Sequence, residues 1–322
     1  MRKSQSEPAS KALSRRDLLR LIPALGIAAA LPAGLYAAAE PHLDFPTRPR
    51  ERLAVTSYPF RAWLVSPANR AREPKKPGLD MCEFPEMIAR RFGVHNVNPL
   101  GDHFASTAPA YLDKFRNALA AARSHLVGLG LGGAQFWDPD PARVEAAVEY
   151  GKKWIDIAAA LGSPSVRQHL RGSHGVAPDV NRAASSLGRL AEYGAKKNVV
   201  VNLENDSPVN ENPFFIVKVI EQVRNPYLRG LPDFGNSIRG QDAAYNQRAV
   251  AAMFRHAFNM SHIKDALAGE GGSTYKIDLA RMFGIAKRSG YRGYFSMEWD
   301  TSQGDPYDGT RRLIRESLQY LG

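Results

Sequence analysis

Four residues that can bind a metal ion recur at similar intervals in the second half of the chain. Each follows or ends a short apolar run, and they are Glu204, Asp233, His262 and Glu298. The intervals of 29, 29 and 36 residues are close to the length of one strand plus one helix. Three carboxylates and one imidazole suit Mn²⁺, Mg²⁺, Co²⁺ or Zn²⁺, with positions left for a substrate. One such residue alone is usually a solvated strand end, but four at repeat spacing predict one divalent metal site.

These side chains would converge if their runs were neighbouring strands of a parallel barrel. Strands are expected at 53–60, 94–100, 125–131 and 165–170, and then at the four runs just described. Helices are expected at 84–92, 110–124, 141–161, 179–197, 213–223, 242–258, 277–289 and 309–321. Eight strand–helix units predict an α/β fold, a single (β/α)₈ TIM barrel over residues 53–322, with its site at the C-terminal strand ends. An open doubly wound sheet is the alternative, but it needs a glycine-rich turn after the first strand, where this chain has Tyr58-Pro59-Phe60-Arg61.

The first 39 residues are typical of a segment for protein export. Arg15 and Arg16 lie in a motif that resembles the twin-arginine signal, an apolar stretch follows at 21–35, and three alanines follow at 37–39. The stretch is short and carries two prolines, so we expect no stable membrane span after cleavage, although retention as an anchor is the alternative. The mature protein is expected to start near Glu40, with a linker at 40–52, and to be periplasmic or secreted.

Composition narrows the classes of partner. The 322 residues are 44% hydrophobic and 23% charged, which is ordinary for a globular protein. The net charge is +11, but without residues 1–39 the chain keeps 37 basic and 30 acidic residues, a charge of +7. It has no dense run of Lys and Arg, so no nucleic-acid partner is expected. A single cysteine, Cys82, excludes an internal disulfide.

Short motifs around the last two strands are similar to those of a known family. They are HIKD from His262, GEG from Gly269, GYRG from Gly290 and FSME ending at Glu298. On these motifs the chain resembles the xylose-isomerase-like TIM barrel superfamily, in particular the sugar isomerases and epimerases related to D-tagatose 3-epimerase. The resemblance covers nearly all of residues 53–322.

The resemblance implies a metal-dependent reaction on a sugar. In such relatives the residues that match Glu204, Asp233, His262 and Glu298 bind one divalent ion, and Mn²⁺ is the ion expected first. The residues that match Glu204 and Glu298 also flank the substrate, where one takes a proton from carbon and the other returns it on the opposite face. An exported protein rarely meets phosphorylated sugars, so the expected substrate is a free sugar or keto-sugar. The alternatives are a metal-dependent lyase, dehydratase or hydrolase on a keto-sugar, cyclitol or glycoside, and a non-enzymatic sugar-binding barrel.

Further residues near the predicted strand ends are candidates for substrate contact. They are His169, Arg171, Asn236, Lys264, Tyr58 and Trp299, with Arg167, Asp102, His103, Phe60 and Trp137 as weaker candidates. Asn236 departs from the family, since several relatives have a histidine there that helps to hold the substrate. That departure also argues against the three-metal site of the superfamily's DNA-repair nucleases. The expected partner is a small carbohydrate, and assembly as a homo-oligomer is compatible with the sequence.

Overall fold

A computed structural model describes residues 39–173, 175–269, 274–301 and 304–321. The signal peptide expected at 1–39 therefore lies, apart from Ala39, outside the described residues. Among the helices of the described ranges, none combines the length and the apolar character that crossing a bilayer requires.

Nine strands of the described ranges form two parallel sheets. They are β1 (Leu53–Thr56), β2 (Asn96–Asn98), β3 (His125–Leu126), β4 (Leu129–Ala134), β5 (Ser165–Leu170), β6 (Val200–Glu204), β7 (Leu228–Leu231), β8 (Met260–Ile263) and β11 (Tyr294–Met297). The sheet orders are β3-β2-β1-β11-β8 and β4-β5-β6-β7. Isolated parallel bridges join the two sheets, from Leu100 beyond β2 to Gly130 in β4 and from Asp233 beyond β7 to His262 in β8. The predicted TIM barrel is confirmed.

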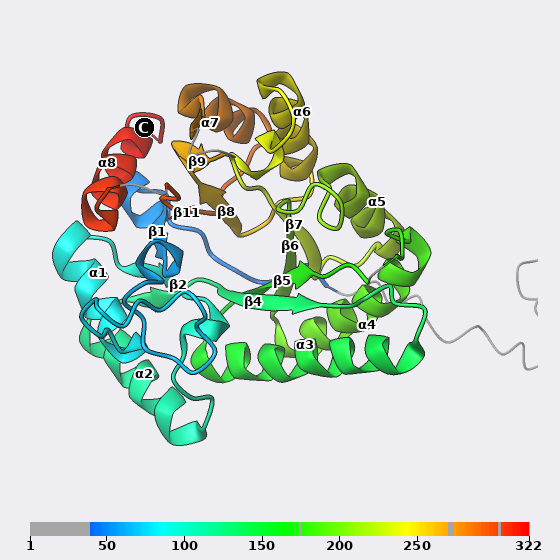
Figure 1. Cartoon of the computed structure of the whole chain (residues 1–322), viewed down its shortest axis with the longest axis horizontal. Helices are drawn as coiled ribbons and strands as arrows, with labels where there is room; N and C mark the ends of the chain where they lie inside the picture. The colour runs from blue at the N-terminus through cyan, green and yellow to red at the C-terminus, as the bar shows by residue number, and fades with distance from the viewer. Residues whose placement is uncertain (1–38, 174, 270–273, 302–303, 322) are drawn as a thin grey trace, which may run out of the picture. The chain divides into compact units, whose positions relative to one another are not determined.

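Eight helices of the described ranges lie around the strands in chain order (Figure 1). They are α1 (Phe84–Phe92), α2 (Pro109–Ala121), α3 (Pro141–Leu161), α4 (Val180–Lys197), α5 (Pro213–Val223), α6 (Ala243–Phe254), α7 (Leu279–Arg288) and α8 (Pro306–Leu318). Local capping explains several bounds: the Asp140 side chain accepts the Ala142 N–H at the start of α3, and Gly162 ends that helix with φ of 74°.

Two predicted strands differ from the structure near the site. The first strand ends at Thr56, because the chain turns into a 3-10 helix at Tyr58–Phe60, with Pro59 inside it. The expected strand 125–131 is divided into β3 and β4, and β4 continues to Ala134. A short antiparallel pair, β9 (Ala266–Ala268) and β10 (Thr274–Lys276), was not predicted and follows β8.

Residues 40–52, expected as a linker, lie against the N-terminal ends of the strands. The Phe45 ring packs edge-on against Phe258 and Tyr294, at centroid distances of 5.4 and 6.2 Å. The backbone N–H of His42 donates to the side-chain oxygen of Asn198 over 3.3 Å. This segment therefore covers the end of the barrel opposite to the predicted site.

Candidate active site

The four predicted metal ligands come together at the C-terminal ends of four strands. Glu204 is the last residue of β6, Asp233 follows β7, His262 lies in β8 and Glu298 follows β11. All four are buried, and each offers one ligand atom within 4.8 Å of the others. The group therefore has the residue types and the spacing of a single-ion site.

The His262 ring is oriented from both sides. Its Nδ1 lies 2.7 Å from Glu204 Oε1 and 3.0 Å from Glu298 Oε2, while its Nε2 lies 2.9 Å from Asn98 Oδ1. Asn98 Nδ2 donates to the carbonyl of Gly128 over 2.8 Å, so its Oδ1 must be the atom that accepts from the ring. Nε2 consequently carries a hydrogen, and Nδ1 is the nitrogen available to an ion.

Asp233 has one fixed oxygen and one free oxygen. Its Oδ1 accepts the backbone N–H groups of Gly235 and Asn236 at 2.8 and 2.7 Å. Its Oδ2 is buried and has no hydrogen-bond partner among the described residues, although Lys264 Nζ lies 3.4 Å away. A buried carboxylate oxygen without a hydrogen-bond donor costs free energy unless a cation lies nearby. Lys264 supplies one at 3.4 Å, and this oxygen keeps its lone pairs open to a metal ion.

The electrostatics of the group favour an added positive charge. Burial, together with the charges of Glu204 and Glu298, raises the pKa of Asp233 to about 7 against the opposing effect of Lys264. Burial also opposes ionisation of Glu204, but the charges of His262 and Arg167 outweigh it and hold the pKa of that carboxyl well below its usual range. Burial lowers the pKa of His262, yet Glu204 and Glu298 outweigh it and raise that pKa above its ordinary value.

A buried lysine holds the other side of the group. Lys264 Nζ donates to Glu298 Oε1 over 2.7 Å and to Asn236 Oδ1 over 3.0 Å, and it lies 3.9 Å from Asp300 Oδ2. Burial disfavours its charge, but the carboxylates, Asp233 first, outweigh burial and raise the pKa of Lys264 well above its ordinary value. Lys264 therefore remains an ammonium that fixes Glu298 and Asn236.

Arg167 holds Glu204 in a corresponding way from β5. Its Nε lies 3.2 Å from Glu204 Oε2, and its Nη1 donates to the carbonyl of Leu131 over 3.4 Å. The guanidinium passes over Gly130, where a Cβ atom would lie 2.7 Å from Arg167 Nη2. The absence of a side chain at Gly130 thus permits this close approach.

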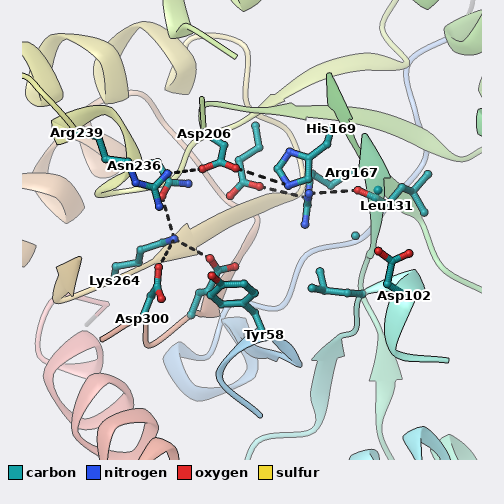
Figure 2. Close-up of a pocket in the computed structure, with 15 residues that line it drawn as sticks. Tyr58, Asp102, Leu131, Arg167, His169, Asp206, Asn236, Arg239, Lys264 and Asp300 are labelled. Carbon is teal, nitrogen blue, oxygen red and sulfur yellow. Dashed lines mark hydrogen bonds and ion pairs between the residues drawn. The ribbon is translucent and has the colours of Figure 1, made fainter. Parts of the chain in front are cut away.

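A cavity of about 220 Å³ opens beside the four-residue group. It is lined by Tyr58, Leu100, Asp102, Gly130, Leu131, Gly132, Arg167, His169, Glu204, Asp206, Asn236, Arg239, Lys264, Glu298 and Asp300, as Figure 2 shows. The predicted contacts Tyr58, His169, Asn236 and Lys264 are among them. Asp206, Arg239 and Asp300 lie in loops beyond strand ends and were not singled out from the sequence.

Two predicted substrate contacts lie outside this cavity lining. Arg171 is exposed and its side chain runs across Gly133, where a Cβ atom would lie 2.3 Å from Arg171 Cγ. The Trp299 side chain is buried against Gly309 of α8, where a Cβ atom would lie 2.3 Å from its Nε1. The structure therefore places Trp299 in the packing between β11 and α8.

Three weaker candidates also lie elsewhere. Phe60 and Trp137 have no exposed surface and belong to the apolar core. The Nδ1 of His103 lies 2.7 Å from Ser57 Oγ, and burial lowers the pKa of this ring to about 4, so it is neutral near pH 7. We assign these residues to packing.

Comparison with known proteins places the fold in a family. The family model described as xylose isomerase-like TIM barrel matches residues 87–322. The chain belongs to the xylose isomerase-like TIM barrel family. No curated protein matches this chain in sequence.

Solved structures agree in fold. A D-allulose 3-epimerase from Methylomonas sp. in complex with D-allulose is 17% identical with a TM-score of 0.64, over 86% of this chain and 99% of that one. A xylose isomerase-like protein from Mycobacterium smegmatis in complex with magnesium is 16% identical with a TM-score of 0.63, over 84% and 96%. A 3-keto-D-glucoside 4-epimerase from E. coli is 15% identical with a TM-score of 0.59, over 78% and 96%. At such identities these likenesses show the fold alone.

Proposed function

We propose that this protein is a divalent-metal-dependent isomerase or epimerase of a free sugar or keto-sugar. The observation that carries the proposal is the pair Glu204 and Glu298, which meet at His262 Nδ1 beside a polar cavity. Sugar epimerases among the structures of similar fold, one of them holding D-allulose, support this choice of substrate class.

The residues present fit a bound ion. Glu204, Asp233, His262 and Glu298 would hold it, and the free Asp233 Oδ2 and the oriented Nδ1 of His262 are suited to that role. Mn²⁺ is the ion we propose first, and Mg²⁺, Co²⁺ or Zn²⁺ would suit the same ligands. Such an ion supplies Lewis acidity that stabilises negative charge on adjacent substrate oxygens.

The chain's own groups then carry the proton chemistry. One of the two glutamates takes a proton from the substrate carbon, which leaves an enediolate, and the other returns a proton on the opposite face. Arg167 fixes Glu204 and Lys264 fixes Glu298, at 3.2 and 2.7 Å, so each carboxylate keeps its direction during the transfer.

Other lining groups can hold the sugar. Asn236 Oδ1 already accepts from Lys264, which leaves the amide nitrogen as the group that can donate to a substrate oxygen. Tyr58 presents its ring to the cavity, and the Arg61 guanidinium lies 4.0 Å from the centroid of that ring. An aromatic surface with a few placed polar groups is typical of small-ligand sites.

We propose a free sugar rather than a sugar phosphate as the substrate because we also propose that the protein is exported. The twin-arginine-type motif would carry a folded protein out of the cytoplasm. Outside the cytoplasm, free sugars and keto-sugars are the available substrates. A substrate panel that pairs each free ketose with its phosphate ester tests this part, because only the free sugars should react.

The test of the reaction type uses deuterated water. Purified protein with Mn²⁺ is incubated with free ketohexoses, and NMR follows deuterium at the carbon next to the carbonyl. We expect deuterium to enter at the carbon that is changed, and a chelator to abolish it. Turnover without deuterium incorporation would contradict the enediolate, and release of water or an alcohol would instead indicate a lyase or hydrolase.

A further inference from the structure

His169 and Glu211 form a hydrogen-bonded pair at the edge of the cavity, apart from the four metal-ligand candidates. His169 lies in β5, Glu211 lies in the loop between β6 and α5, and His169 Nδ1 is 2.6 Å from Glu211 Oε1. The His169 side chain is 26% exposed and lines the cavity, whereas the Glu211 side chain is only 6% exposed. The ring thus reaches the cavity, and the carboxylate supports it from behind.

Glu211 is fixed by the backbone on both oxygens. Its Oε1 also accepts the N–H of Leu170 over 2.7 Å, and its Oε2 accepts the N–H of Ser207 over 3.3 Å. An ionised carboxylate is an acceptor only, so the hydrogen between the two side chains belongs to His169 Nδ1. The second ring nitrogen, Nε2, lies 3.9 Å from Asp206 Oδ2, beyond hydrogen-bond distance, so it is open to a substrate in the cavity that both residues line.

We propose that His169 transfers a proton between substrate oxygens and that Glu211 is the residue that positions it. This inference rests on the proposed function, since it adds a third proton carrier to the pair Glu204 and Glu298. A carboxylate behind a histidine fixes the tautomer and steadies the ring when it gains a proton. His169 is therefore equipped for general acid–base catalysis on an oxygen rather than on carbon.

A histidine that moves a proton between two substrate oxygens is needed when the carbonyl group changes position. When a ketose becomes an aldose, a glutamate moves the carbon-bound proton, the old carbonyl oxygen gains a proton and the neighbouring hydroxyl oxygen loses one. His169 Nε2 takes the hydroxyl proton and gives it to the other oxygen, so the ring ends as it began and no oxidant is required. An epimerisation that restores the same carbonyl needs no transfer between oxygens. The pair of His169 and Glu211 therefore points to an aldose–ketose isomerisation at this site. We call the accompanying move of the carbonyl to the neighbouring carbon carbonyl migration.

Binding of a second metal ion is the alternative role for His169, Asp206 and Glu211. These residues offer three ligand atoms within 4.8 Å of one another. Both oxygens of Glu211 already accept hydrogen bonds, and Asp206 Oδ1 accepts from Arg239 Nη1 over 2.6 Å. An ion bound through Glu211 would have to compete with the backbone donors that already hold both of its oxygens. We therefore expect one bound ion per chain.

The experiment separates exchange at carbon from migration of the carbonyl. Wild-type protein, His169→Gln, Glu211→Gln and the control His125→Gln, an exposed histidine at the start of β3, are incubated with Mn²⁺ in deuterated water. Free ketohexoses and aldohexoses serve as probes, and NMR follows deuterium at carbon and aldose–ketose conversion separately. We expect His169→Gln to keep carbon exchange within several-fold and to lose carbonyl migration by about 10²–10⁴-fold. Glu211→Gln should lose less migration and shift its pH profile, while the control behaves as wild type.

Several results would overturn the role of this pair. A merely structural His169 would lose exchange and migration together, and an unused one would lose neither. Wild-type protein that exchanges carbon-bound hydrogen without moving the carbonyl would show that no oxygen transfer occurs. If wild-type protein binds a second equivalent of Mn²⁺ and His169→Gln does not, His169 is a metal ligand rather than a proton carrier. If wild-type protein exchanges no carbon-bound hydrogen on any sugar, the proposed function itself fails, and the role of His169 fails with it.

Discussion

His262 Nε2 lies 2.9 Å from Asn98 Oδ1, although the two residues are 164 positions apart in the chain. Asn98 also accepts from Ser296 Oγ over 3.3 Å and donates to the carbonyl of Gly128, so its amide cannot turn over without losing partners. This contact across the barrel decides which nitrogen of His262 faces the carboxylates. Asn98 is therefore a positioning residue for the metal site.

Replacing Asn98 by Ala should weaken metal binding while the ligands stay in place. Loss of such an outer partner typically costs about 10–100-fold in metal affinity. Titration of metal-free protein with Mn²⁺ measures the change. Asn202→Ala is the matched control, because Asn202 is equally buried and bonds to Asn259 rather than to a ligand candidate. Equal affinities for Asn98→Ala and wild type would exclude the positioning role.

Metal affinity should rise with pH. The carboxylates raise the pKa of metal-free His262, and burial raises that of Asp233 to about 7, so both hold protons that an ion must displace. Below these pKa values protons compete with the ion, and the competition ends as pH rises through them. Binding calorimetry in buffers of different ionisation enthalpy should show proton release at neutral pH. An affinity that is flat from about pH 5 to 8, the range in which histidines titrate, would refute this coupling.

Glu204→Gln and Glu298→Gln should each abolish most activity and leave the fold intact. A glutamine side chain can weakly bind an ion through oxygen but cannot take a proton from carbon. The loss should reach at least about 10²–10⁴-fold, the usual contribution of general acid–base catalysis. Rates on a reactive sugar and circular dichroism spectra measure the two effects. Near-normal rates in both variants would remove the glutamates from the chemistry.

We expect export to depend on Arg15 and Arg16, the arginine pair of the proposed signal. Replacing both by lysine should keep the protein in the cytoplasm, because the twin-arginine route recognises the arginine pair itself. Cell fractionation with a tagged chain measures the distribution. Unchanged export of the double variant would indicate a different route.

The sequence predicted the barrel and the four metal-ligand candidates because both follow from local patterns. The predicted helix 141–161 has the bounds of α3, since Asp140, Pro141 and Gly162 mark its ends chemically. Glu204 and Glu298 were found because each follows a run of buried strand residues. Parallel strands of one barrel bring such positions to the same rim.

The remaining parts of the site depend on contacts that no local pattern contains. Asn98 acts through His262 in β8, Gly130 makes room for Arg167 on the neighbouring strand β5, and Glu211 lies in a loop seven residues after Glu204. Trp299 was expected in the site because it follows Glu298. Alternation along a strand no longer holds there, since β11 ends at Met297 and the Trp299 indole packs on α8.

The central claim is one divalent ion held by four residues from four strands. A crystal of the protein soaked with Mn²⁺ and measured at the manganese absorption edge tests it most directly. We predict one anomalous peak per chain with Glu204, Asp233, His262 Nδ1 and Glu298 as ligands. A peak held by other residues, or no peak in crystals that contain the ion, would contradict the claim.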